Sequence, residues 1–127
     1  MRARFAFVAC AALLTATTAQ AADAPVQKMD TTMGSVLANP EGMTLYTYAK
    51  DQPGQSACVD ACAANWPPLM ADADATGSGD YSVIDRPDGG KQWAYKGQPL
   101  YLWVRDKQPG DTTGAGMANG AWEVAKP

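Results

Sequence analysis

Histidine is absent from all 127 residues of the chain. It is the commonest general base in enzymes and the commonest side-chain ligand of transition metals. Serine hydrolysis would lack its histidine partner, and no glycine-rich phosphate loop follows a predicted strand. The sequence therefore favours a protein that is not an enzyme and that needs no cofactor.

Long apolar runs are also scarce, and the one at the start of the chain has the form of a secretory signal peptide. Basic residues open the chain, residues 5–14 are apolar, and Ala19-Gln20-Ala21 is a small-x-small cleavage site. The run is shorter than the ~20 residues that cross a bilayer. We expect residues 1–21 to be removed, which leaves no transmembrane segment and a periplasmic or secreted protein that begins at Ala22.

Positive charge is in short supply after that cleavage. The mature 106 residues keep eight basic and all 13 acidic residues, a net charge of −5. Nucleic acid and anionic lipid bind basic patches, so neither is an expected partner. The length is that of one domain. An unknown protein or small-molecule ligand in the cell envelope is the expected partner.

No phenylalanine remains in the mature chain, so tryptophan and tyrosine must supply the aromatic part of the core. Many of them stand in a stretch that occurs twice, 55 positions apart, with the pattern Tyr-x-aromatic-x-x-Asp. A tryptophan follows each copy after 20 or 21 residues. The residues are Tyr46, Tyr48, Asp51 and Trp66 in the first copy, and Tyr101, Trp103, Asp106 and Trp122 in the second.

The pattern of turns and apolar residues predicts a mostly β fold with one short helix. Residues 22–33 read as a flexible leader, and 34–127 as a single β-rich domain built from two related hairpin or meander units, about 34–71 and 81–127. Strands are expected at 35–38, 44–49, 81–85, 91–95, 99–104 and 121–125. The Ala-rich segment 56–65 is the expected helix, and the acidic segment 72–80 a loop between the units.

The doubled motif resembles that of a bacterial family of predicted lipoproteins or secreted repeats of unknown function. The resemblance covers roughly 34–127 and includes Cys58-x-x-x-Cys62, Asn65-Trp66-Pro67-Pro68 and Pro109-Gly110-Asp111. It implies an exported, often tandemly repeated β-rich domain whose biochemical role is not established. The chain departs from the lipoprotein label, because its predicted cleavage site precedes Ala22 rather than a cysteine.

Two interpretations of the motif aromatics compete. Side chains alternate along a strand, so Tyr46 and Tyr48 project from one side, and Tyr101 and Trp103 do the same. Together with Trp66 and Trp122 they would form either a face that stacks on a flat ligand or a buried core.

The motif aspartates have a structural and a catalytic interpretation. Asp51 and Asp106 each follow a strand and precede a Pro-Gly turn, which favours a carboxylate that orders the turn over a pair of acid and base catalysts. Asp106→Ala is then expected to cost ~1 kcal/mol, as the loss of a capping interaction does.

The cysteine pair allows three interpretations. In an oxidising compartment a disulfide between Cys58 and Cys62 is the default expectation. The pair closes a short loop, so a purely structural bond would add less than about 3 kcal/mol. The alternatives are a thiol-redox pair, or Cu(I) held by both sulfurs with Met43 or Met33. The sequence thus predicts an exported, non-enzymatic binding or scaffold module, with a thiol-redox or Cu(I)-handling protein as the alternative.

Overall fold

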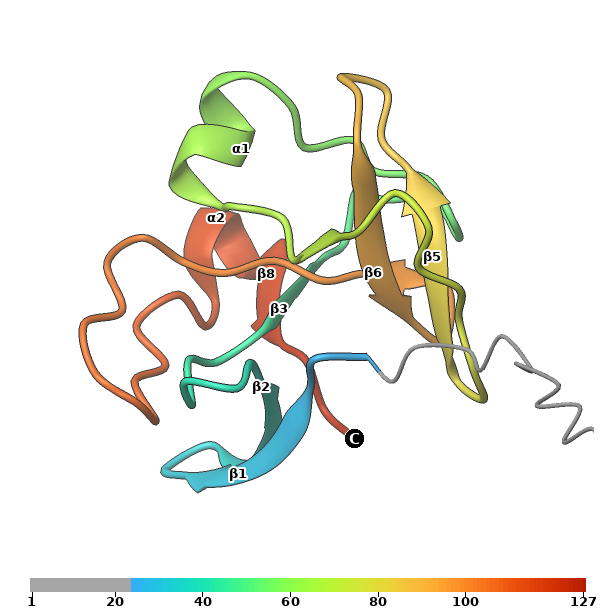
Figure 1. Cartoon of the computed structure of the whole chain (residues 1–127). Coiled ribbons are helices and arrows are strands. Elements are labelled where there is room, and N and C mark those ends of the chain that lie inside the picture. Colours follow the sequence, from blue (N-terminus) through green and yellow to red (C-terminus); the bar gives the residue numbers. More distant parts are fainter. Residues whose placement is uncertain (1–23) are drawn as a thin grey trace, which may run out of the picture.

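The computed structural model describes residues 24–127, so the predicted signal peptide lies outside the described residues. Short antiparallel strands account for most of the regular secondary structure (Figure 1). The strands are β1 (Gln27–Thr31), β2 (Gly34–Ala38), β3 (Tyr46–Tyr48), β4 (Met70–Ala71), β5 (Tyr81–Asp85), β6 (Lys91–Tyr95), β7 (Gln98–Pro99) and β8 (Trp122–Val124). Two short helices accompany them, α1 (Ala61–Asn65) and α2 (Met117–Gly120). The fold is mostly β, as the sequence predicts.

The first hairpin begins earlier than the sequence predicts. β1 pairs with all five residues of β2, from Gln27 opposite Ala38 to Thr31 opposite Gly34. The Thr31 hydroxyl donates to the Gly34 carbonyl across the turn, and Gly34 takes the positive φ that the turn requires. The expectation that order begins at Gly34 is wrong, because the alternation around Met29 gives β1 a side that packs on the core.

The helical content also differs from the prediction of one helix over 56–65. α1 covers only 61–65 because the preceding residues use their backbone groups otherwise. Asp51 accepts the Ala57 amide, the Ser56 hydroxyl accepts the Cys58 amide, and Asp60 has a positive φ. α2 is a second helix that the glycine-rich sequence concealed, with left-handed residues inside it.

The second unit forms a meander in which the third strand is cut short. β5 pairs with β6 from Tyr81 opposite Tyr95 to Asp85 opposite Lys91, but β7 keeps only two residues. The chain then leaves β6 because the Tyr101 amide donates to the Tyr46 carbonyl, and the Tyr46 amide donates to the Tyr101 carbonyl. Both residues of this mutual pair are fully buried, and the pair joins the two units.

Each unit gives its last strand to the other. β8, from the end of the second unit, pairs with β3 of the first, and β4, from the end of the first, pairs with β6 of the second. The backbone bonds repeat the exchange. The amide of Leu45 donates to Leu37, Leu37 to Ala125, and Ala125 to Leu45; in the second unit Leu100 donates to Trp93, Trp93 to Leu69, and Leu69 to Leu100.

Two buried clusters form the core. One contains the motif aromatics with Val36, Cys58 and Val124, and the other is aliphatic around Leu37, Leu45 and Leu100, with Trp93 at its side. No helix among residues 24–127 is long and apolar enough to cross a membrane.

Candidate functional site

Four aromatic rings lie in one continuous stack along the line where the two units meet. Trp103 stacks on Trp66 with ring centroids 4.1 Å apart, Trp66 on Trp122 at 3.9 Å, and Trp122 on Tyr48 at 4.2 Å. The three tryptophans are at most 9% exposed, and only Tyr48 at one end is half-buried. This aromatic stack alternates between the units, so it joins them as interior packing does.

The two remaining motif tyrosines, Tyr46 and Tyr101, contact the stack with their rings and the other unit with their hydroxyl groups. Tyr46 packs edge-on against Trp66, and Tyr101 edge-on against Trp122. The Tyr46 hydroxyl donates to Asp106 at 2.6 Å, and the Tyr101 hydroxyl donates to Asp51 at the same distance. Tyr46 and Tyr101 therefore each bind the motif aspartate of the opposite unit.

The carboxylates also order the loops that follow them. The second oxygen of Asp51 accepts the Ala57 amide, and that of Asp106 accepts both the amide and the hydroxyl of Thr113. The aspartates thus accept backbone amides six or seven residues further along, beyond the Pro-Gly turn itself. The tyrosine partners were beyond sequence reasoning, because the bonds span 50 and 60 residues.

Burial and the neighbouring carboxylates shift three pKa values in this crossed arrangement. Desolvation, reinforced by the hydrogen bond to Asp106, raises the pKa of Tyr46 far above its ordinary value. Desolvation and the bond to Asp51 do the same to the pKa of Tyr101. Desolvation also raises the pKa of Asp51, against the lowering effect of the Tyr101 and Ala57 hydrogen bonds.

Alkaline titration should reveal the crossed pairs. A tyrosine whose folded pKa is raised contributes stability that is present below its unfolded pKa of about 10 and is lost as the pH rises through the folded pKa. We expect at least two of the five tyrosines to ionise only when the protein unfolds, measured by tyrosinate absorbance beside circular dichroism. Tyr101→Phe should reduce by one tyrosine the tyrosinate absorbance that appears only on unfolding. Ionisation of all five tyrosines in the folded protein would contradict the expectation.

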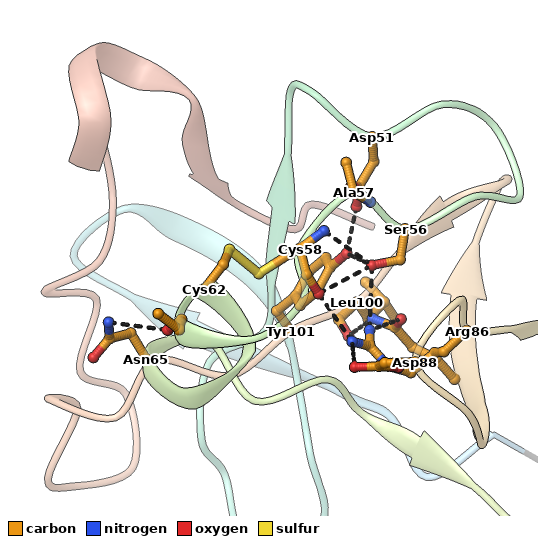
Figure 2. The surroundings of a disulfide bond; sticks show 12 residues. Asp51, Ser56, Ala57, Cys58, Cys62, Asn65, Arg86, Asp88, Leu100 and Tyr101 are labelled. Carbon is orange, nitrogen blue, oxygen red and sulfur yellow. Dashed lines mark hydrogen bonds and ion pairs between the residues drawn. A yellow bond between two sulfur atoms is a disulfide. The ribbon is translucent and has the colours of Figure 1, made fainter.

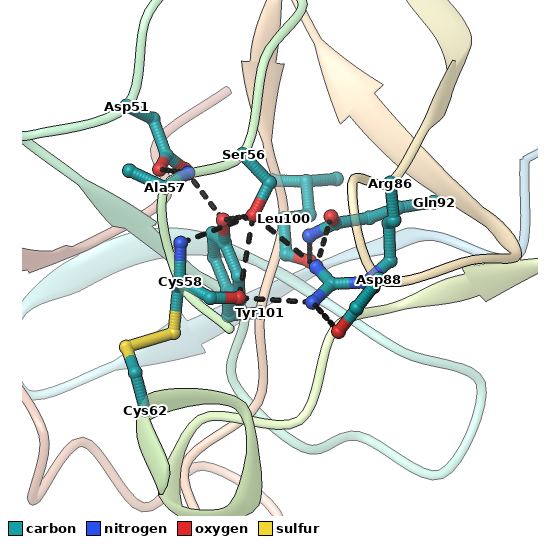
Figure 3. A network of polar contacts seen from close by, with 10 residues as sticks. All are labelled: Asp51, Ser56, Ala57, Cys58, Cys62, Arg86, Asp88, Gln92, Leu100 and Tyr101. Carbon is teal, nitrogen blue, oxygen red and sulfur yellow. Dashed lines mark hydrogen bonds and ion pairs between the residues drawn. A yellow bond between two sulfur atoms is a disulfide. The ribbon is translucent and has the colours of Figure 1, made fainter. Parts of the chain in front are cut away.

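A buried arginine connects the second unit to the cysteine loop of the first (Figure 3). Arg86 lies just after β5, with a side chain that is 2% exposed. Its five N–H groups all donate, to Ser56, Gln92, the Cys58 carbonyl and both oxygens of Asp88. The hydrogen bonds to Arg86 lower the pKa of Asp88. The Ser56 hydroxyl bonds Tyr101 at 2.6 Å, so the network continues to Asp51.

The cysteines form a disulfide beside this network (Figure 2). Cys58 is fully buried against the aromatic cluster, whereas Cys62 is half-buried in α1. Residues 24–127 contain no group of three or more histidine, cysteine, aspartate or glutamate side chains placed to hold a metal ion. Met43 is half-buried on the segment before β3.

A cleft reaches the surface beside the motif residues Tyr48 and Asp51. It has a volume of about 200 Å³ and lies between the turn at Gln52–Gln55 and the turn at Lys96–Gly97. The half-buried end of the aromatic stack, Tyr48, lines it together with Asp51 and two prolines, Pro53 and Pro99. A larger, shallower hollow of about 480 Å³ lies by the 75–79 loop, away from the motif.

The structure brings all eight predicted motif and tryptophan residues into one region. It adds three residues that sequence reasoning missed, Ser56, Arg86 and Gln92. Arg86 heads a Pro-Asp-Gly turn and Gln92 alternates within a strand, so neither pattern signals burial. The buried charge of Arg86 and the polar side chains that it binds are visible only when the units are assembled.

Comparison with known proteins gives one family. A family model described as a secreted repeat of unknown function matches residues 28–70 and again 82–126. No curated protein and no solved structure matches the chain. The first matched segment includes most of β1, in agreement with the pairing of β1 and β2.

Proposed function

Because the chain belongs to the family of secreted repeats of unknown function and carries two copies, we propose that it is an exported, non-enzymatic binding or scaffold module. One observation carries the proposal: the side chains with reactive chemistry bind one another across the two units. Both motif aspartates accept a tyrosine hydroxyl, and Arg86 uses all its donors internally. Groups held in this way stabilise an arrangement of strands and turns.

Buried hydrogen-bonded groups of this kind supply rigidity at the interface of the units. A rigid body with a small cleft suits a module that presents a fixed surface to another molecule in the cell envelope. The ligand or partner at that surface is the part of the function that the family assignment leaves open.

A thiol-redox or Cu(I)-handling protein is the second candidate. In its favour, Cys62 is half-buried, so one sulfur of the disulfide is nearer to solvent than the other. Copper would need both cysteines reduced first, because the two sulfurs are bonded to each other, and Met43 would be the third ligand.

Thiol titration of the mature protein across a glutathione redox series, with and without Cu(I), separates the two candidates. We expect the disulfide to stay oxidised where exposed, labile disulfides are reduced, because Cys58 is buried and its carbonyl accepts Arg86. Copper should leave the melting temperature unchanged. The matched control is the double variant Cys58→Ser, Cys62→Ser. Reduction by mild reductant, or one Cu(I) bound per chain in a Met43-dependent way, would favour the second candidate.

A further inference from the structure

The two units contain equivalent clefts, one filled and one open. The Gly54 amide donates to the Gly97 carbonyl beside Pro53, and the Gly110 amide donates to the Gly42 carbonyl beside Pro109. Gly42 and Gly97 also have nearly the same positive φ, 82° and 81°. The two turn-to-turn junctions are therefore the same structure repeated.

A methionine from β1 fills the first of these junctions. A Cβ placed on Gly42 would lie 2.8 Å from the Cε of Met29, and one on Gly110 would lie 3.9 Å from its Sδ. Met29 also packs on the aromatic cluster. The thioether end of Met29 thus occupies the space between the turn and the stack.

The second junction has no such occupant. A Cβ on Gly97 would meet only Pro53, at 3.8 Å, and one on Gly54 would meet nothing within 4 Å. The open space is the cleft of about 200 Å³ lined by Tyr48 and Pro99. By the pairing of the hairpins, Ile84 stands opposite Gln92 where Met29 stands opposite Val36. Isoleucine is shorter and branched, so the second hairpin lacks a side chain of methionine's reach at this position.

The two clefts differ in charge at one position of the rim, although Asp51 also lines the open cleft. Lys96 precedes Gly97 where Glu41 precedes Gly42. The Lys96 amine lies over the Tyr95 ring at 5.2 Å, and among residues 24–127 it takes part in no ion pair. A carboxylate on an incoming ligand would therefore find an unpaired cation at the rim.

We propose that the open cleft at Gly97 binds a methionine, or another long unbranched apolar side chain, presented by an extended segment of a partner protein with an acidic residue next to it. The proposal rests on the binding role proposed above and names its ligand. Methionine suits the site because its flexible thioether fits irregular gaps and packs well against aromatic rings. Its seat is the edge formed by Tyr48, Gly97 and Pro99.

The probe is a synthetic heptapeptide with the sequence of residues 26–32, Val-Gln-Lys-Met-Asp-Thr-Thr, titrated into the isotope-labelled full mature protein. We expect amide shifts at Ala49 and Gly97, with binding about tenfold weaker when the methionine of the peptide is replaced by alanine. Replacing its aspartate by lysine should weaken binding several-fold, as should Lys96→Glu in the protein.

A matched pair of variants locates the site. Ala49→Trp places a large ring at the open cleft, and Val104→Trp places it at the equivalent position of the filled one. The first should abolish peptide binding and the second should leave it unchanged. Equal effects of the two variants would overturn the proposal, and circular dichroism of both checks that they fold.

Other results overturn the proposal in distinct ways. Shifts at Gly42 and Gly110 without shifts at Gly97 would mean that the peptide displaces β1. Shifts at Gly97 that depend on protein concentration alone, with a dimer mass by light scattering, would assign the cleft to a second copy. An absence of binding refutes this ligand while leaving the redox series, and hence the proposed function, to stand on its own.

Discussion

Asp106→Asn is expected to lower the free energy of unfolding by about 2–3 kcal/mol. The substitution retains an acceptor for Thr113 but turns an amide group toward the Tyr46 hydroxyl, which already accepts the Gly114 amide. That hydroxyl then has no acceptor for its proton, and Tyr46 is fully buried. A cap that served only the loop would cost ~1 kcal/mol. The crossed bond to tyrosine is the reason for the larger value.

Asp51→Asn is the matched control, because the other crossed pair has a second acceptor. The Tyr101 hydroxyl can turn its proton to Ser56, 2.6 Å away, and accept from the new amide. We expect a change within about 1 kcal/mol. Urea unfolding at neutral pH measures both variants, and an equal loss in the two would refute the asymmetry.

The pH dependence gives Asp51→Asn a second readout. Because desolvation raises the pKa of Asp51 above the ordinary 3.8, its contribution to stability is complete below that pH and is lost as the pH rises through the raised pKa. The wild-type protein should lose this contribution above about pH 4 and the Asp51→Asn variant should not.

Trp66→Ala should have the largest effect of any single substitution, about 3–5 kcal/mol. Trp66 lies between Trp103 and Trp122 in the aromatic stack and receives the edge of Tyr46. Removal of the indole leaves a cavity with rigid rings on three sides, and these rings cannot easily move in to fill it. Denaturant unfolding should show the loss as a shifted midpoint with an unchanged slope.

Tyr48→Ala serves as the control for that measurement, since Tyr48 ends the stack and is half-buried. We expect it to cost roughly half as much as Trp66→Ala. Gly114→Ala tests the same contact from the other side, because its Cβ would lie 2.8 Å from the Trp66 ring. If Trp66→Ala lowered the free energy of unfolding no more than Tyr48→Ala does, the stack would not be the centre of the interface.

Local signals in the sequence were enough to predict most strands. The alternating residues of β5 and β6 and the turns around Pro53-Gly54 and Lys96-Gly97 depend on neighbours a few positions away, and each lies where the sequence predicts. The Cys58–Cys62 disulfide is present as expected. Family membership and the two copies are confirmed by the matched segments.

What escaped prediction depends on contacts between the units. The observed helix is shorter than the predicted 56–65, because the Ala57 and Cys58 amides donate to the side chains of Asp51 and Ser56. β1 falls within the predicted flexible leader, because five residues with one half-buried methionine give too weak a pattern without the groove that receives it. The sequence predicts only a turn at Arg86, since nothing near it in sequence indicates that its side chain donates to Ser56 and to the Cys58 carbonyl of the other unit.

The exchange of last strands has a consequence for how copies of such a unit assemble. Two separate identical copies that exchanged the strands equivalent to β4 and β8 would form a swapped homodimer, whereas in this chain the 72–80 segment connects the two units. In a chain with an odd number of copies, the last copy would lack the strand that a second copy supplies. It would have to borrow that strand from a neighbouring molecule, which turns copy number into a rule for assembly.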